Sequence, residues 1–210
     1  MTATNNTRAK AAGLIFVMLS ALFLLGLPAI GGNSGGQETT TASGSELKLY
    51  AGKYYMLRTD LEGEDLLEVE LRLQAMAECY NERTEGFSGK IKTKFPFYLY
   101  SQLSDYQAAV AREGEDPDDV RSAGQYESDN RLLRATVESI DDPQDAWRIV
   151  QHEGFHQFAD VVISPDTDLP TWLNEGMAEY FGKGIWTGDT LVCGIVSDGR
   201  ELEDDDFNSL

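Results

Sequence analysis

The chain of 210 residues is long enough for one folded domain with additional segments, and its 41% hydrophobic and 10% aromatic residues suit a globular core. Acidic residues outnumber basic ones by 36 to 17, which gives a net charge of −19 at pH 7. Such a chain repels phosphate backbones, so we expect no nucleic acid among its partners.

The N-terminus has the pattern of an export signal. Arg8 and Lys10 precede an almost unbroken apolar run over residues 11–30, and this order is typical of a secretory signal. The run is also about long enough to span a bilayer. We therefore expect residues 1–31 to be a signal peptide or a membrane anchor, with both alternatives open. Either one predicts an extracytoplasmic protein, secreted or anchored to the membrane.

A linker and a single domain are expected after this segment. Residues 32–45 are rich in Gly, Ser and Thr and lack an apolar period, which predicts a flexible polar linker. The folded domain is then expected over residues 46–210. Its two cysteines, Cys79 and Cys193, would form a disulfide outside the cytoplasm or remain two buried thiols, and the sequence favours neither.

The apolar patterns predict strands first and the longest helices later, which indicates an α+β fold. In chain order, we expect two strands around a Gly-Lys turn within 47–58, a helix over 66–80, a strand over 95–100, a helix over 104–111, and a strand over 131–137 in a hairpin with Gly124 and Tyr126. Two helices with clear boundary signals follow, one from Pro143 to about Val161 and one from about Pro170 to Gly182. A weak strand over 191–196 precedes an acidic end.

The helix predicted from Pro143 to about Val161 contains the only histidines of the chain, His152 and His156, four positions apart. Positions i and i+4 share one helix face, so both imidazoles would point the same way and could bind one Zn²⁺. Glu153 is rotated by about 100° from His152, beside such a metal, where it could take a proton from a metal-bound water. The alternative is a pair of histidines without a metal on an ordinary helix.

The opposite face of this helix is predicted to pack into the core through Trp147, Val150, Gly154, Phe158 and Val161. Glycine costs about 1 kcal/mol against alanine in a helix interior, so we expect another backbone to approach closely at Gly154. Asp160, one turn after His156, is expected to be a surface residue near the helix end.

A catalytic zinc needs a third protein ligand, and because no other histidine exists it must be a carboxylate or a thiolate. Neither cysteine lies in a metal-binding spacing. Glu175 follows His156 after the eighteen residues 157–174, within the segment WLNEGMAEYF. Glu175 is thus one carboxylate that the sequence offers for this place.

The segments HEGFHQF (152–158) and LPTWLNEGMAEYF (169–181), at this spacing, resemble the gluzincin metallopeptidases. They are more closely similar to an uncharacterised bacterial family of the peptidase MA-like superfamily. The resemblance covers about residues 147–182. It implies a zincin-like domain in which a small mixed sheet is followed by the HExxH helix and a glutamate-ligand helix, with a short or truncated C-terminal subdomain.

The same resemblance implies a zinc metallopeptidase. Zn²⁺ would be held by His152, His156 and Glu175, with Glu153 as the general base for hydrolysis of a peptide or protein substrate by metal-bound water. Glu179, one turn after Glu175, would hold a ligand imidazole by its free N–H, and a solvated surface acid is the alternative.

Two features depart from the family pattern. An oxyanion donor is needed, and Tyr106, Tyr126, Tyr180 and Arg200 are available without a motif that selects among them. The Gly-rich exopeptidase motif of the related aminopeptidases is also missing, so an aminopeptidase is not expected. These departures keep two alternatives open: a non-catalytic, envelope-anchored zinc-binding or scaffold protein, and a structural zinc site.

Overall fold

The computed structural model describes residues 38–112, 122–138, 143–165 and 169–194. These residues belong to one compact unit, Gln37–Leu210. The signal or anchor predicted over residues 1–31 lies outside the described residues. Within the described ranges, no helix combines the length and the apolarity that crossing a membrane requires.

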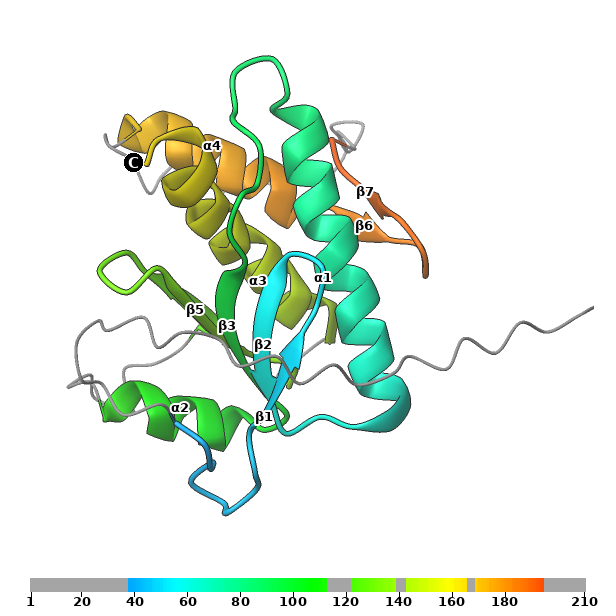
Figure 1. The fold of residues 1–210 in the computed structure, drawn as a ribbon, viewed down its shortest axis with the longest axis vertical. Coiled ribbons are helices and arrows are strands. Elements are labelled where there is room, and N and C mark those ends of the chain that lie inside the picture. The colour runs from blue at the N-terminus through cyan, green and yellow to red at the C-terminus, as the bar shows by residue number, and fades with distance from the viewer. Residues whose placement is uncertain (1–37, 113–121, 139–142, 166–168, 195–210) are drawn as a thin grey trace, which may run out of the picture. The chain divides into compact units, whose positions relative to one another are not determined.

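A five-stranded mixed sheet forms the centre of the unit (Figure 1). Its strands, in spatial order, are β1 (Lys48–Ala51), β2 (Tyr55–Thr59), β3 (Phe95–Tyr100), β5 (Leu132–Thr136) and β4 (Gly124–Glu127). The three central strands are parallel, whereas β1 and β4 run antiparallel to their neighbours at the two edges. The expected α+β class with a small mixed sheet is therefore confirmed.

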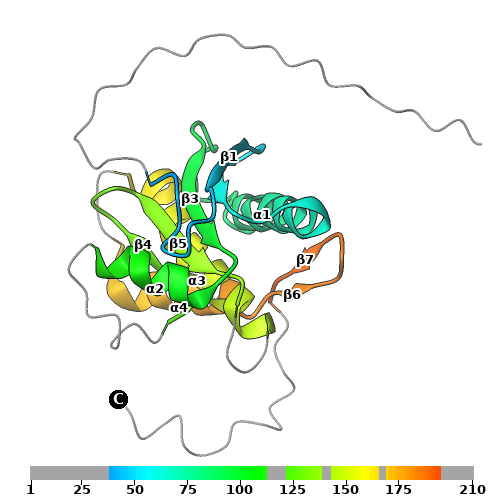
Figure 2. The same cartoon turned by 90° about the horizontal axis from the view of Figure 1, so that it is seen from below.

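Helices cover both faces of the sheet. The described helices are α1 (Gly63–Arg83), α2 (Leu103–Ala111), α3 (Pro143–Phe158), the π-helical turn η1 (Ala159–Ile163) and α4 (Thr171–Gly182). Alternate residues of β3 face opposite sides, so Phe97 joins the main core with α1 and α3, and Tyr100 joins a smaller cluster with α2. A hairpin of β6 (Ile185–Trp186) and β7 (Leu191–Val192) lies beside α1 (Figures 1 and 2).

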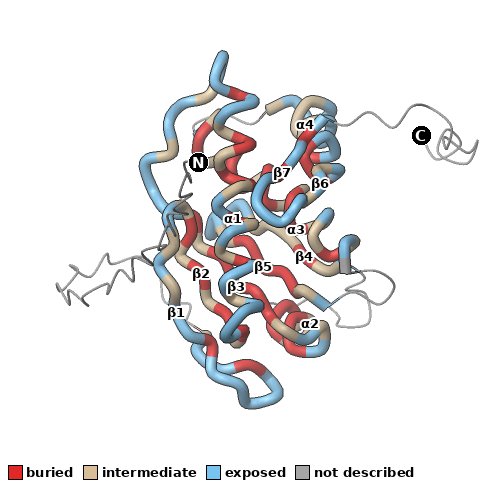
Figure 3. The backbone as a smooth tube through the Cα atoms, turned by 90° about the vertical axis from the view of Figure 1, so that its right-hand side faces the viewer, coloured by how far each residue is buried: buried red, intermediate tan, exposed pale blue. Residues whose placement is uncertain are grey.

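Four aromatic rings hold α1, α3 and α4 together. Tyr80 of α1 contacts Phe155 and Phe158 of α3 edge to face, with centroid distances of 5.7 and 5.6 Å. Phe181 of α4 lies 4.7 Å from Tyr80 and stacks on Phe155 at 4.8 Å. All four rings are fully buried, between elements that carry exposed residues on their outer surfaces (Figure 3). This cluster fixes α3 and α4 relative to each other from behind the histidine face.

The prediction for the inner face of α3 is confirmed in its burial and corrected in one detail. Val150 and Phe158 are buried as expected. The close neighbours of Gly154 are side chains, because a Cβ at this position would lie 2.9 Å from the Cε atom of Met76 and 3.4 Å from the hydroxyl of Tyr80. The space beside Gly154 is thus occupied by α1 side chains and not by a second backbone, and the terminal methyl of Met76 would have to shift to admit a Cβ.

The described part of the predicted linker, residues 38–45, packs against the domain. Thr41 is buried, and Thr40 forms a β-bridge with Glu46. The Ser43 N–H donates to the buried Asp105 carboxylate at 2.7 Å, and the Ser43 hydroxyl bonds to the same group. A composition of Gly, Ser and Thr suggested flexibility, but short polar side chains also form turns when a distant partner satisfies them.

The two cysteines, for which the sequence left two alternatives, are paired. The disulfide joins Cys79 of α1 to Cys193, one residue after β7, across a sequence separation of 114. It attaches the β6–β7 hairpin, and with it the chain that follows α4, to α1. The loop closed by this bond contains α3 and α4 entirely.

Candidate metal centre

The two histidines lie side by side on the exposed face of α3. Their Nε2 atoms are 3.1 Å apart, and the ring centroids are separated by 4.8 Å. The helix is fixed here by Gln157, the residue after His156. Its buried side-chain amide donates to the carbonyl oxygens of Pro96 and Arg131, both at 2.8 Å, and so attaches α3 to the sheet.

Helix α4 brings a carboxylate to this pair. The Oε2 atom of Glu175 lies 3.4 Å from Nε2 of His152 and 3.6 Å from Nε2 of His156. Gly182, two turns further along α4, allows the two helices to approach. A Cβ at Gly182 would lie 3.3 Å both from the carbonyl oxygen of Arg148 and from the Cβ atom of His152.

The separations of these three atoms can be compared with those expected around a metal ion. Ligand bonds of about 2.0–2.1 Å at tetrahedral angles place neighbouring ligand atoms about 3.3–3.4 Å apart. The three sides of the triangle are 3.1, 3.4 and 3.6 Å. Two imidazole nitrogens and one carboxylate oxygen are also ligands that zinc accepts, and a set of three leaves its fourth position open. The residues therefore fit a zinc ion.

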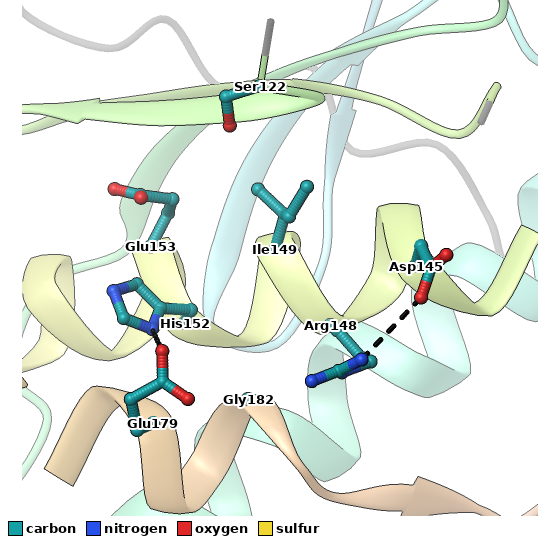
Figure 4. A pocket seen from close by; sticks show the side chains of 8 residues that line it. All are labelled: Ser122, Asp145, Arg148, Ile149, His152, Glu153, Glu179 and Gly182. Carbon is teal, nitrogen blue, oxygen red and sulfur yellow. Dashed lines mark ion pairs between the residues drawn. The ribbon is translucent and has the colours of Figure 1, made fainter. Parts of the chain in front are cut away.

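The outer nitrogens of the two rings have different surroundings. Glu179 extends from α4 toward His152, and its Oε1 atom lies 3.5 Å from Nδ1 of that ring (Figure 4). A carboxylate at this place favours a proton on Nδ1 and leaves the lone pair of Nε2 free for a metal. Nδ1 of His156 and Oδ1 of Asn174 are both buried without a hydrogen-bond partner among the described residues. They are complementary as donor and acceptor, and both residues line one cavity.

Glu153 lies in the cleft beside the histidines. Burial raises the pKa of its carboxyl group above the ordinary value, while the imidazoles of His156 and His152 act in the opposite direction. The backbone N–H of Tyr126, on the edge strand β4, donates to its Oε2 atom at 3.0 Å. One oxygen of Glu153 is thus held by the sheet edge, and the group has the raised basicity that a proton acceptor needs.

Two cavities meet at Glu153. One has a volume of about 390 Å³ and lies over α3, with Ser122 on one side and Gly182 of α4 on the other (Figure 4). The other, of about 440 Å³, contains His156 and Glu175 and extends past Tyr126. Together they form a cleft with α3 as its floor, the β4 edge as one wall and α4 as the other.

The structure places the described candidate oxyanion donors in different parts of the chain, and Tyr126 lies in the cleft. Tyr126 lines the cavity beside Glu153, but its hydroxyl donates to Asp160. Tyr106 is buried in the α2 cluster, and Tyr180 is 39% exposed on α4. Arg200 lies outside the described residues. Asp160 lies near the end of the histidine helix, as expected, within η1, but it is half-buried and its carboxylate accepts a hydrogen bond from the hydroxyl of Tyr126.

Sequence reasoning missed several neighbours of the site. Gln157, which anchors α3, belongs to the quoted motif but has no apolar or charged character that would identify a buried anchor. Arg148 and Asn174 are ordinary polar helix residues in the sequence, and only the packing of α3 against α4 places them at the cleft. Comparisons with protein-family models, with curated proteins and with solved structures found no match.

Proposed function

We propose that the chain is a zinc-dependent hydrolase of peptide bonds with a zincin-like domain. The observation that carries this proposal is the convergence of His152, His156 and Glu175, whose ligand atoms form a triangle of the size that tetrahedral zinc requires. In the absence of a metal, the close pair of Nε2 atoms would be explained by an N–H···N bond between the two rings. That explanation gives no role to Glu175.

Zinc bound by these residues would polarise a carbonyl group and lower the pKa of a coordinated water. Glu153 would accept the proton of the attacking water and return it to the leaving amine. Its burial suits this exchange because desolvation raises its pKa and favours uptake of the proton, whereas the N–H bond from Tyr126 stabilises the carboxylate and holds one of its oxygens in place. Glu179 would orient His152 through Nδ1, and the cleft along β4 would take an extended peptide.

The location proposed for this activity is outside the cytoplasm. A disulfide between Cys79 and Cys193 persists only in an oxidising compartment in most organisms, which agrees with the export pattern of residues 1–31. The disulfide supports the secreted or membrane-anchored alternatives equally.

The test is the Glu153→Gln variant of the full-length chain, assayed with a fluorogenic peptide library and by elemental analysis. We expect zinc to remain stoichiometric and hydrolysis to fall by about 10²–10⁴-fold, which is the usual contribution of general acid–base catalysis. Glu82→Gln is the matched control, because Glu82 is an exposed acid on α1.

Three outcomes decide between the alternatives. Loss of activity with retained zinc supports the proposal. Equal activity of the variant and the control would remove Glu153 from the mechanism. Stoichiometric zinc without hydrolysis in the unmodified chain would favour the zinc-binding scaffold protein instead.

A further inference from the structure

A separate cavity of about 190 Å³ lies between α1, α3 and the start of the β6–β7 hairpin. We call it the tryptophan cavity, after the two tryptophans in its wall. The lining residues used below are Arg72, Trp147, Arg148, Gln151, Lys183 and Trp186. At about 30 Å³ per water molecule, its volume corresponds to about six waters, which is room for one amino-acid residue and not for a long segment.

The lining of the tryptophan cavity is basic in a chain with a net charge of −19, although each of its three cations also has an acidic neighbour outside the lining. Arg72, Arg148 and Lys183 line it, and none of its described lining residues is acidic. Among the described residues, two of these cations have loose ion pairs outside the cavity: Arg148 lies 3.6 Å from Asp145, and Lys183 lies 3.8 Å from Glu179. Exposed pairs of this length contribute little, so both side chains are free to turn toward an anion.

Arg72 is held in a fixed position at the cavity wall. Its guanidinium group lies 4.6 Å from the ring of Trp147 and 5.5 Å from the ring of Trp186, and Glu68 binds one of its amino groups at 2.8 Å. Stacking on two indoles keeps the planar donor set oriented at small entropic cost. The indoles also provide an apolar surface for the side chain of a bound residue.

Two polar atoms of lining residues are buried and have no hydrogen-bond partner among the described residues. These atoms are Nε of Arg72, a donor, and Oε1 of Gln151, an acceptor on a side chain that is 5% exposed. Buried polar groups in native proteins are normally satisfied, by a ligand or water where protein does not suffice. A residue with a carboxylate supplies an acceptor, and its peptide N–H supplies a donor.

The tryptophan cavity adjoins the metal centre through one residue. Arg148 lines both this cavity and the cavity beside His152 and Glu153, and it stands one helical turn before His152 on α3. Its side chain extends from α3 toward α4 (Figure 4). A peptide that lies in the cleft can therefore place a neighbouring residue against Arg148 and Lys183.

We propose that the tryptophan cavity binds a carboxylate-bearing residue of a peptide, with Arg148, Lys183 and Arg72 as the charge partners. This inference deepens the proposed function, because it assigns a preference for acidic or free C-terminal residues to the same cleft. It runs against the strongly acidic composition of the chain, which by itself favours basic partners. The carboxylate comes either from a chain terminus or from an Asp or Glu side chain, and both present the same chemistry.

The experiment measures binding directly, in the full-length chain stripped of zinc, so that it does not depend on catalysis. The probes are N-acetyl-Leu-Leu as the free acid and as the amide, and the amides of N-acetyl-Leu-Glu and N-acetyl-Leu-Gln. Quenching of tryptophan fluorescence reports occupancy, because Trp147 and Trp186 line the cavity. We expect each carboxylate probe to bind at least about tenfold more tightly than its uncharged counterpart, since hydrogen bonds to charged groups contribute about 1.5–3 kcal/mol.

The variants Arg148→Gln and Lys183→Gln should abolish this discrimination. Both side chains are more than half exposed, at 56% and 62%, so the variants are expected to fold. Arg112→Gln and Lys53→Gln are matched controls, with exposures of 51% and 53% at sites away from the cavity. N-acetyl-Leu-Leu as the free acid carries a terminal carboxylate, and the amide of N-acetyl-Leu-Glu carries a side-chain carboxylate. Comparing their binding therefore shows which of the two the cavity prefers.

Equal binding of acids and amides, or unchanged discrimination in the two cavity variants, would overturn the carboxylate site. These outcomes are distinct from a failure of the proposed function. Carboxylate binding in a chain that hydrolyses no peptide would refute the peptidase and keep the site. Hydrolysis without discrimination would keep the peptidase and refute the site.

Discussion

Replacement of Gln157 by leucine tests the anchor that fixes the histidine helix. The buried amide of Gln157 donates to the carbonyl oxygens of Pro96 and Arg131, both at 2.8 Å, and leucine would leave both acceptors unsatisfied. Each buried carbonyl oxygen without a hydrogen bond lowers the free energy of unfolding by about 1–3 kcal/mol, so the two together lower it by about 2–6 kcal/mol. The Oε1 atom of Gln157 has no partner among the described residues, and its removal offsets about 1 kcal/mol. We expect a net loss of about 1–5 kcal/mol.

The loss is measured as the free energy of unfolding in urea, with and without zinc. Gln74→Leu is the control, because Gln74 is exposed on α1 and its amide contacts only Glu78, at 3.1 Å. Substitutions at such sites usually change stability by less than about 0.5 kcal/mol. Zinc retention should also fall in the Gln157 variant alone, since His156 is the preceding residue. Identical urea midpoints for the two variants would refute the role of this side chain as an anchor.

Two further predictions concern the metal and the disulfide. Glu175→Ala should weaken zinc binding by more than about 100-fold, whereas Glu179→Ala, which removes a carboxylate that faces the outer nitrogen of His152 and not the candidate ligand atoms, should weaken it by about 10–100-fold. Dialysis against chelators of graded zinc affinity measures the zinc affinity of both variants. Equal losses of affinity would contradict a ligand role for Glu175 and an orienting role for Glu179. The double variant Cys79→Ser and Cys193→Ser should lose up to about 4–5 kcal/mol of stability, because the bond closes a loop with a sequence separation of 114. Unfolding curves that do not respond to reductant in the unmodified chain would exclude this bond.

The elements with strong local signals could be predicted from the sequence. The strands around the Gly-Lys turn, the strand FPFYLY and the two helices with clear boundary signals lie where their apolar periods and prolines indicate. The histidine pair follows from helix geometry alone, since i and i+4 always share a face. The proximity of Glu175 needed a family resemblance in addition, because no local rule brings two separate helices together.

The remaining features depend on contacts between distant segments. Gly154 faces side chains of α1 and not the second backbone that was expected, and the turn that contains Thr41 and Ser43 depends on Asp105 in α2. Local composition reveals neither contact. The predicted helix to about Val161 covers most of η1, but its π-helical geometry was missed. Tyr126 could be listed as a candidate but not selected, because its position depends on the pairing of β4 with β5 and the packing of β4 on α3.

In the proposed metal centre, the absence of a side chain at Gly182 would influence the size of the ion that the ligands can hold. Alanine there would press on the carbonyl of Arg148 and the Cβ atom of His152, both 3.3 Å from the added carbon, and so push α4 outward. The sides of the ligand triangle that end at Glu175 would then lengthen. Longer sides would no longer match the roughly 2.0–2.1 Å bonds of tetrahedral zinc. In the proposed centre, the missing methyl group at Gly182 would therefore favour zinc binding.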